Sequence, residues 1–143
     1  MKITTKSGDK GESGLMGGKR LSKADPVFDV LGDIDELNSV LGWVKCEFSA
    51  HGHKSMRDFI NFMQENLYKA MAMISGSQNS QLEDSDTEFL ERKMDELKKE
   101  ADIGSEFITP GKNELSARLD IARAVCRRAE RSYVKYAQDK DLK

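Results

Sequence analysis

Apolar residues repeat with helical spacing along most of the chain after residue 24. The first stretch begins at Asp25-Pro26, where a residue typical of an N-cap precedes a proline suited to the first helical position. A second stretch covers residues 56–74 and ends at Gly76. The first helix is expected to end near residue 49, and its apolar face is formed by Val27, Val30, Leu31, Ile34, Leu37, Leu41 and Val44.

Two further helices follow the polar stretch 77–85. Ser85 with Glu88 three residues later fits a capping box, so a third helix is expected from there to about Ala101. Residues 102–112 form a connection, and a long helix is expected from about Asn113 to about residue 137. Strand signals are nearly absent. The pattern therefore predicts an all-α fold, an antiparallel helical bundle of the ferritin-like up-and-down type.

Residues 1–24 differ from the rest because they contain five of the eleven glycines and little periodicity. They are expected to form an irregular, glycine-rich segment in front of the bundle. At 143 residues the chain fits a single domain, residues 1–143, with the bundle in residues 25–143.

Composition points to a cytoplasmic protein. Charged residues make up 34% of the chain, and no apolar run approaches the roughly 18 residues that a bilayer span needs, so no membrane association is expected. The two cysteines, Cys46 and Cys126, lie too far apart in sequence to suggest a metal knuckle. We expect both to be reduced, packed thiols.

The net charge of −2 conceals two basic segments. Residues 1–23 contain six Lys or Arg against two acidic residues, and residues 116–135 have the same balance, so each carries +4 and the remainder −10. Nucleic-acid-binding domains are usually basic throughout, so no nucleic acid is expected. The segments indicate a local anion site, with ordinary solvated faces as the alternative.

The glycine-rich segment was tested against the phosphate-binding P-loop pattern. With Lys19 as the pattern's lysine, Ser13 stands at its first glycine and Arg20 at its Ser/Thr, so the pattern fails. Glycines can still let backbone N–H groups converge on an anion that nearby lysines neutralise. A flexible tail without function is the alternative.

In the last helix Arg123, Arg127 and Arg131 recur every four residues and so share one face, with Glu130 beside them and Arg128 pointing elsewhere. An anion, or carboxylates of another helix, could balance this stripe, and plain solvation is the alternative.

The first helix carries the acidic cluster Asp33, Asp35 and Glu36. These carboxylates could serve acid–base chemistry, bind a metal, or pair with the arginine stripe of a neighbouring helix or subunit, and the pairing is favoured. His51-Gly52-His53 is expected to be a surface turn, and no metal site is predicted.

Three blocks resemble the ATP:cob(I)alamin adenosyltransferases of the propanediol-utilisation type. The first block is 5–15 with 17–23 after it, and the second is Gly32-Asp33-Ile34-Asp35-Glu36-Leu37-Asn38-Ser39. The third extends from Phe107-Ile108-Thr109-Pro110-Gly111 to Cys126-Arg127-Arg128-Ala129-Glu130-Arg131 and is the most specific. Their order and spacing span residues 3–135.

The resemblance implies a homotrimer with ATP at each subunit interface, between the N-terminal segment of one chain and the arginine helix of the next. Asp35 would pair with Arg123 across the interface, and Phe107 would wall the corrinoid pocket where cobalt loses its lower ligand. The implied ATP contacts are Thr5, Lys6, Ser7, Gly8, Ser13, Gly14 and Lys23 from one side and Arg127, Arg128, Glu130 and Arg131 from the other.

The implied chemistry is attack of cob(I)alamin on the 5′ carbon of ATP with loss of triphosphate, which positive side chains and Mg²⁺ would stabilise. The resemblance also implies a cobalamin reductase and a B12-dependent acceptor enzyme as partners. A relative that carries or senses ATP or corrinoid without catalysis is the alternative, and a purely structural oligomer is a third reading.

The chain departs from the family pattern in two places. Residues 136–143 lack the Asn-Arg-x-Ser-Asp-like segment of the family's final helix, so we expect a bundle without that helix and with apolar surface exposed. Lys112 stands where the family usually has a second glycine.

Overall fold

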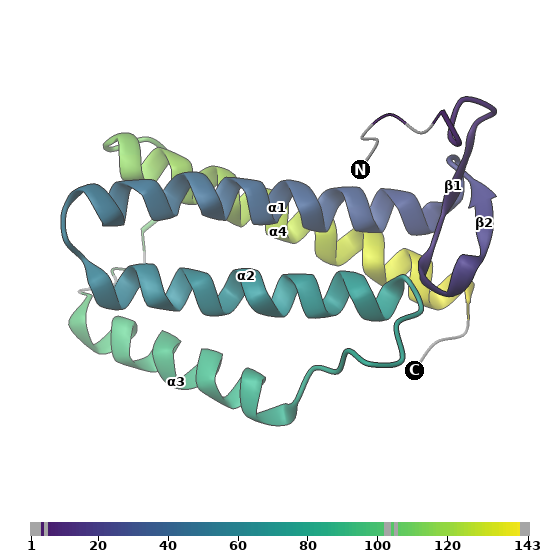
Figure 1. Ribbon diagram of the computed structural model, residues 1–143. Coiled ribbons are helices and arrows are strands. Elements are labelled where there is room, and N and C mark those ends of the chain that lie inside the picture. The colour runs from purple at the N-terminus through teal and green to yellow at the C-terminus, as the bar shows by residue number, and fades with distance from the viewer. Residues whose placement is uncertain (1–3, 5, 102–103, 105, 141–143) are drawn as a thin grey trace.

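The computed structural model describes residue 4, residues 6–101, residue 104 and residues 106–140. Within these residues the main elements are four helices, α1 (Pro26–Ala50), α2 (Lys54–Ile74), α3 (Asp84–Glu100) and α4 (Glu114–Asp139). Successive helices run in opposite directions; α1 packs against both α2 and α4, and α3 lies along the outer side of α2 (Figure 1). The predicted antiparallel helical bundle is confirmed.

The ends of α1 and α4 follow the local sequence signals. Asp25 caps α1 by accepting a hydrogen bond from the backbone N–H of Val27 at 3.0 Å. Asn113 caps α4 by accepting from the N–H of Ser116 at 2.8 Å, and the Ser116 hydroxyl accepts in return from the N–H of Asn113 at 3.0 Å. Both caps satisfy amide groups that the first helical turn leaves without partners.

The start of α3 was predicted two residues too late. Its N-cap is Glu83, not Ser85. The Asp86 carboxylate accepts from the backbone N–H of Glu83 at 3.1 Å, which completes a capping box built from acidic residues. This carboxylate also accepts a hydrogen bond from the Lys69 ammonium at 3.1 Å, so the capping residue links α3 to α2.

The N-terminal segment is more regular than predicted. Strand β1 (Glu12–Gly14) pairs with the antiparallel strand β2 (Arg20–Ser22), with a 3₁₀ turn at Met16–Gly18 between them. Gly17 and Gly18 have φ angles of 80° and 82° there, which side chains strongly disfavour. Strands of three residues are too short to display a two-residue period, which is why the hydrophobic pattern missed them.

The core is a seam between α1 and the small apolar residues of α4. Ala122 and Val125 pack with a cluster that includes Val44 of α1 and Ile60 of α2. Ala129 packs with Val30 and Ile34 nearer the hairpin. Small side chains on α4 allow the two helix axes to approach closely.

Between α4 and the α2–α3 side of the bundle, two apolar hollows of about 500 and about 560 Å³ lie open. Leu119 and Tyr133 of α4 border them and are substantially exposed, so the predicted exposure of apolar surface is confirmed for these residues. Among the described helices, none combines the length and apolarity of a bilayer span.

Truncation of Ile60 tests the seam. Ile60 is 2% exposed, so Ile60→Ala should lower the free energy of unfolding by about 3 kcal/mol through lost burial and a cavity. Urea unfolding followed by circular dichroism measures the change. Met94 of α3 is 65% exposed, and Met94→Ala should stay within about 0.5 kcal/mol of wild type. Equal losses for both variants would contradict this description of the core.

Candidate functional site

The loop before β1 is held against the hairpin by Arg20. The Arg20 guanidinium donates to the backbone carbonyl of Ser7 at 2.8 Å and approaches the Glu12 carboxylate at 3.4 Å. The backbone N–H of Lys23 donates to the carbonyl of Gly11 at 2.8 Å. Two of the candidate ATP contacts, Ser7 and Lys23, are therefore held by hydrogen bonds within the single chain.

Gly8 and Lys23 come together in this arrangement. A Cβ atom built on Gly8 would lie 3.0 Å from Nζ of Lys23, so a larger residue there would displace the lysine. Ser13 and Gly14 lie in β1 opposite Leu21 and Arg20. Lys6 has a positive φ of 58°. The expected contact Thr5 lies outside the described residues.

Arg123, Arg127 and Arg131 are all exposed on α4, and so is Glu130. Nε of Arg123 lies 3.9 Å from an Asp120 carboxylate oxygen, and its side chain is 63% exposed. Within the described part of the chain, no ion pair reaches Arg127 or Arg131. Arg127 and Arg131 therefore present positive charge outward that no ion pair among the described residues balances.

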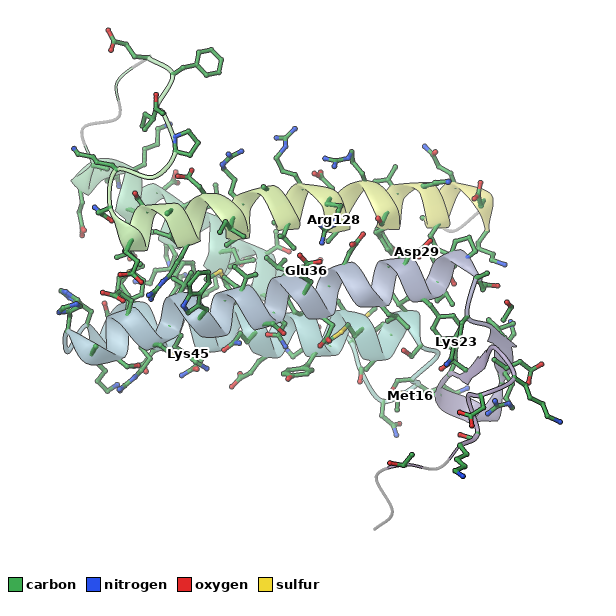
Figure 2. All side chains as sticks on the ribbon, turned by 90° about the horizontal axis from the view of Figure 1, so that it is seen from above. Met16, Lys23, Asp29, Glu36, Lys45 and Arg128 are labelled. Atoms are coloured by element: carbon green, nitrogen blue, oxygen red, sulfur yellow. The ribbon has the colours of Figure 1, made fainter. Side chains whose placement is uncertain are left out.

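Arg128 faces α1 instead. Its Nε donates to Asp33 at 2.8 Å, and one of its terminal nitrogens donates to Glu36. The hydroxyl of Ser132 donates to the second Asp33 oxygen. Figure 2 shows Arg128 and Glu36 reaching toward each other across the gap between α4 and α1. The sequence-based prediction that Arg128 points away from the stripe is confirmed.

This network shifts the ionisation of its members. Burial alone would raise the pKa of Asp33, but hydrogen bonds from Ser132 and Arg128 and the charges of Arg128 and Arg131 outweigh it and hold that pKa below its ordinary value of 3.8. The hydrogen bond to Asp33, with the nearby Glu36 charge, raises the pKa of Arg128. The lowered pKa of Asp33 and the raised pKa of Arg128 therefore favour the charged form of both residues.

The acidic cluster of α1 divides between two surroundings. Asp33 and Glu36 pair with an arginine of a neighbouring helix, but this arginine is Arg128 and not a member of the predicted stripe. Asp35 is exposed and has no ion pair among the described residues. Its pairing with Arg123 of another chain stays a prediction, and the exposure of both side chains leaves them free to make it.

Phe107 lies in the connection before α4 and is fully exposed. The same connection is attached to α4 where the backbone N–H of Gly111 donates to Asp120 at 3.2 Å. Gly111 has a φ of 89°, so a side chain there would strain the turn. Because Asp120 also faces Arg123, it links this connection to the first arginine of the stripe.

Two arginines with structural roles were not found from the sequence. Arg20 orders the N-terminal loop, and Arg118 bridges α4 to α1 at the other end of the bundle. Arg118 is 9% exposed, donates to Glu47 at 2.8 Å and stacks 4.6 Å from the Trp43 ring centre. Neither belongs to a repeating pattern, so no sequence signal marks them.

The cysteines were expected to be packed, and this is wrong. Cys46 and Cys126 are both exposed. Cys126 borders the apolar hollow of about 500 Å³, which is open to solvent among the described residues. His51 and His53 are exposed in a turn, as predicted, and the His51 ring lies 3.0 Å from Glu47. Within the described residues, no three His, Cys, Asp or Glu side chains gather to hold a metal ion.

The N-terminal hairpin lies at the same end of the bundle as the last turns of α4 in both views (Figures 1 and 2). Even so, no hydrogen bond or ion pair joins residues 8–23 to the described residues of α4. The two basic segments thus form separate surfaces on one chain.

Comparison with known proteins identifies the family to which the chain belongs. A family model described as cobalamin adenosyltransferase matches residues 3–143. The chain belongs to the cobalamin adenosyltransferase family. The corrinoid adenosyltransferase of Bacillus subtilis is 34% identical over 146 residues, which cover 99% of this chain and 75% of that protein.

Two other members of the cobalamin adenosyltransferase family also match nearly all of this chain. The human corrinoid adenosyltransferase is 32% identical, with 96% of this chain and 58% of the relative covered. For the PduO corrinoid adenosyltransferase of Salmonella typhimurium the identity is 29% and the coverage 100% and 44%. The chain therefore spans between 44% and 75% of the lengths of these three relatives.

A solved structure shares the family fold. It is a variant PduO-type ATP:corrinoid adenosyltransferase from Lactobacillus reuteri complexed with cobalamin and ATP. Its TM-score to this chain is 0.87 at 29% identity, and the match covers 96% of this chain and 76% of that one. The resemblance read from the three sequence blocks is confirmed at the level of family and fold.

Neutralising Asp33 tests the network between α1 and α4. Because the folded state lowers the pKa of Asp33, its ionised form stabilises the fold above the ordinary pKa of 3.8, and this contribution is lost as the pH falls through the lower folded-state pKa. Asp33→Asn should therefore be less stable than wild type at pH 7, and the difference should shrink below pH 3.8. Urea unfolding at a series of pH values measures it.

The matched control is Glu65→Gln, which removes an exposed carboxylate of α2. This control should unfold like wild type at every pH. A difference for Asp33→Asn that stays constant into the acid range would contradict the assigned ion pair.

Proposed function

We propose that this chain transfers the 5′-deoxyadenosyl group of ATP to cob(I)alamin or a related corrinoid, with release of triphosphate. The observation that carries the proposal is the outward stripe of Arg123, Arg127 and Arg131, in which only Arg123 has an ion pair among the described residues, with Asp120. Like charges held on one helix face destabilise each other. A bound polyanion relieves that repulsion, and the triphosphate of ATP has the charge to do so.

In the proposed reaction, the electron pair of Co(I) attacks the 5′ carbon of ATP. A cobalt–carbon bond forms, and the bond from that carbon to the triphosphate oxygen breaks, so the electron pair leaves with triphosphate. No protein nucleophile is needed. The stripe would stabilise the negative charge that grows on the leaving group, and alignment of carbon with cobalt would supply the rest.

The other side of ATP is assigned to the hairpin segment. The proposal gives contacts to Thr5, Lys6, Ser7, Gly8, Ser13, Gly14 and Lys23, and on α4 to Arg127, Glu130 and Arg131. The fit of Lys23 against Gly8 and the anchoring of the loop by Arg20 support a preformed segment. Magnesium would enter on the triphosphate, since the described residues offer no metal cluster of their own.

The nucleotide would sit between two chains of a homotrimer. Support comes from the separation of the two basic surfaces within one chain and from the exposed, unpaired Asp35. In the trimer Asp35 would pair with Arg123 of the next chain, and Phe107 would wall the corrinoid. The exposed apolar borders of α4 would also become partly covered.

Residues 1–143 would form one adenosyltransferase domain that works in the cytoplasm, where Cys46 and Cys126 stay reduced. A reductase must supply cob(I)alamin, because the proposed attack consumes Co(I). A B12-dependent enzyme would accept the product. The second candidate function is a carrier or sensor that binds ATP or corrinoid without catalysis; the two uncovered hollows favour it, since a site with an open wall admits water.

Removal of one stripe arginine tests the activity. Arg127→Ala or Arg123→Ala should lower the rate of adenosylcobalamin formation at least about tenfold, because each deletes a charge that stabilises the leaving triphosphate. The measurement is the spectral change of reduced cobalamin supplied with ATP, with circular dichroism to show that the bundle stays folded.

Lys98→Ala on α3 is the matched control, since it deletes an exposed positive charge away from the stripe. It should keep the wild-type rate. Wild-type turnover in both arginine variants would contradict the assignment, while MgATP binding without any product in the unmodified chain would favour the carrier.

Shared sites can be tested by mixing inactive chains. Lys23→Ala and Arg127→Ala should each be nearly inactive, but co-expressed chains should recover about a quarter of the wild-type rate, because random mixing leaves that share of interfaces with an intact hairpin and an intact helix. No recovery, despite mixed oligomers on native mass spectrometry, would place each site within one chain.

A further inference from the structure

Arg128 differs from Arg127 and Arg131 on the stripe because its charge is already balanced by carboxylates of α1. Its guanidinium forms one bond to Asp33 at 2.8 Å and another to Glu36. One turn further along α4, Ser132 donates to the same Asp33. A planar guanidinium held by two carboxylates has a fixed direction, which a single ion pair would not impose.

The direction of Arg128 sets the direction of its neighbours. On an α-helix, Arg127 and Arg131 lie about 100° and about 60° around the axis from Arg128, both on the same side. A roll of α4 by about 20° would move a group about 5 Å from the axis by about 2 Å. Misplacement by about 1 Å is enough to reduce catalysis strongly, so the stripe depends on what stops α4 from rolling.

The apolar packing of α4 gives little resistance to such a roll. The fully buried apolar residues of α4 are Ala122, Val125 and Ala129, and its larger packed side chains, Leu115 and Tyr136, lie near the two ends of the helix. Alanine methyl groups are small and do not interlock with a facing helix as larger side chains do. Polar bridges therefore add rotational definition along the middle of α4, and Arg128 is the bridge beside the stripe.

We infer that Arg128 is a positioning residue: Asp33 and Glu36 hold it so that Arg127 and Arg131 present their charges to the triphosphate. The inference rests on the proposed function for the identity of the ligand. It assigns Arg128 a different task from the ATP contact that the family resemblance implies. The carboxylates of α1 then support nucleotide binding although they carry the same sign of charge as the nucleotide.

The negative charge of Asp33 and Glu36 makes the inference testable. Neutralising Asp33 and Glu36 together removes two negative charges close to the stripe. If Arg128 bound the triphosphate directly, the double variant Asp33→Asn/Glu36→Gln would free it and strengthen ATP binding. If Arg128 positions the stripe, the same variant should weaken ATP binding.

The experiment is isothermal titration of MgATP into the full chain. Arg128→Ala and Asp33→Asn/Glu36→Gln should each raise the Kd at least about tenfold, and the triple variant should be no weaker than either, because both changes break one arrangement. Glu88→Gln/Asp95→Asn on α3 is the control for loss of two exposed carboxylates. It should leave the Kd unchanged.

An unchanged or lower Kd for Asp33→Asn/Glu36→Gln overturns the inference. So does a loss of stability in urea without a change in the Kd of the folded protein, because that result describes a purely structural bridge. A wild-type chain that binds MgATP but forms no adenosylcobalamin overturns only the proposed function, and the variant Kd values still decide the role of Arg128. A wild-type chain without ATP affinity overturns both.

Discussion

The close contact between α1 and α4 determines the rest of the arrangement. Small apolar residues of α4 form the seam, with one arginine bridge near the start of α4, Arg118 with Glu47, and another near its centre, Arg128 with Asp33 and Glu36. The seam decides how near the helices lie, and the bridges decide how α4 is turned. The rotation of α4 about its axis determines which side chains its outer face presents to a ligand.

The arginines of α4 have different roles that depend on the face of the helix on which they lie. Those facing α1 form ion pairs with carboxylates and contribute to the fold. On the exposed stripe, the one ion pair among the described residues is that of Arg123 with Asp120, at 3.9 Å. Unbalanced charge lowers the stability of the free protein and is recovered when an anion binds. Natural proteins commonly break a local rule of stability at the place where they act.

Periodicity and capping residues predicted the helices, the faces they bury and the separate direction of Arg128, because these features depend on spacing along the chain. The hairpin was missed because its strands have three residues each. Arg20 and Arg118 were not predicted because neither residue belongs to a repeating sequence pattern. Periodicity also showed which faces are apolar but not whether another element covers them, which is why Cys126 proved exposed. The pairing of Asp35 with Arg123 concerns two chains, so one chain cannot display it.

The bridge between Arg128 and Asp33 joins residues that are 95 positions apart in sequence, and that between Arg118 and Glu47 joins residues 71 apart. By contrast, α1 and α2 are connected by a turn of three residues and can pair as soon as both exist. During synthesis the α4-facing side of α1 therefore stays apolar and unpaired until α4 has been made. Closing so long a loop carries an entropic cost that the completed seam offsets. The outer face of α4, with its arginine stripe, thus acquires its orientation only when this long-range contact forms.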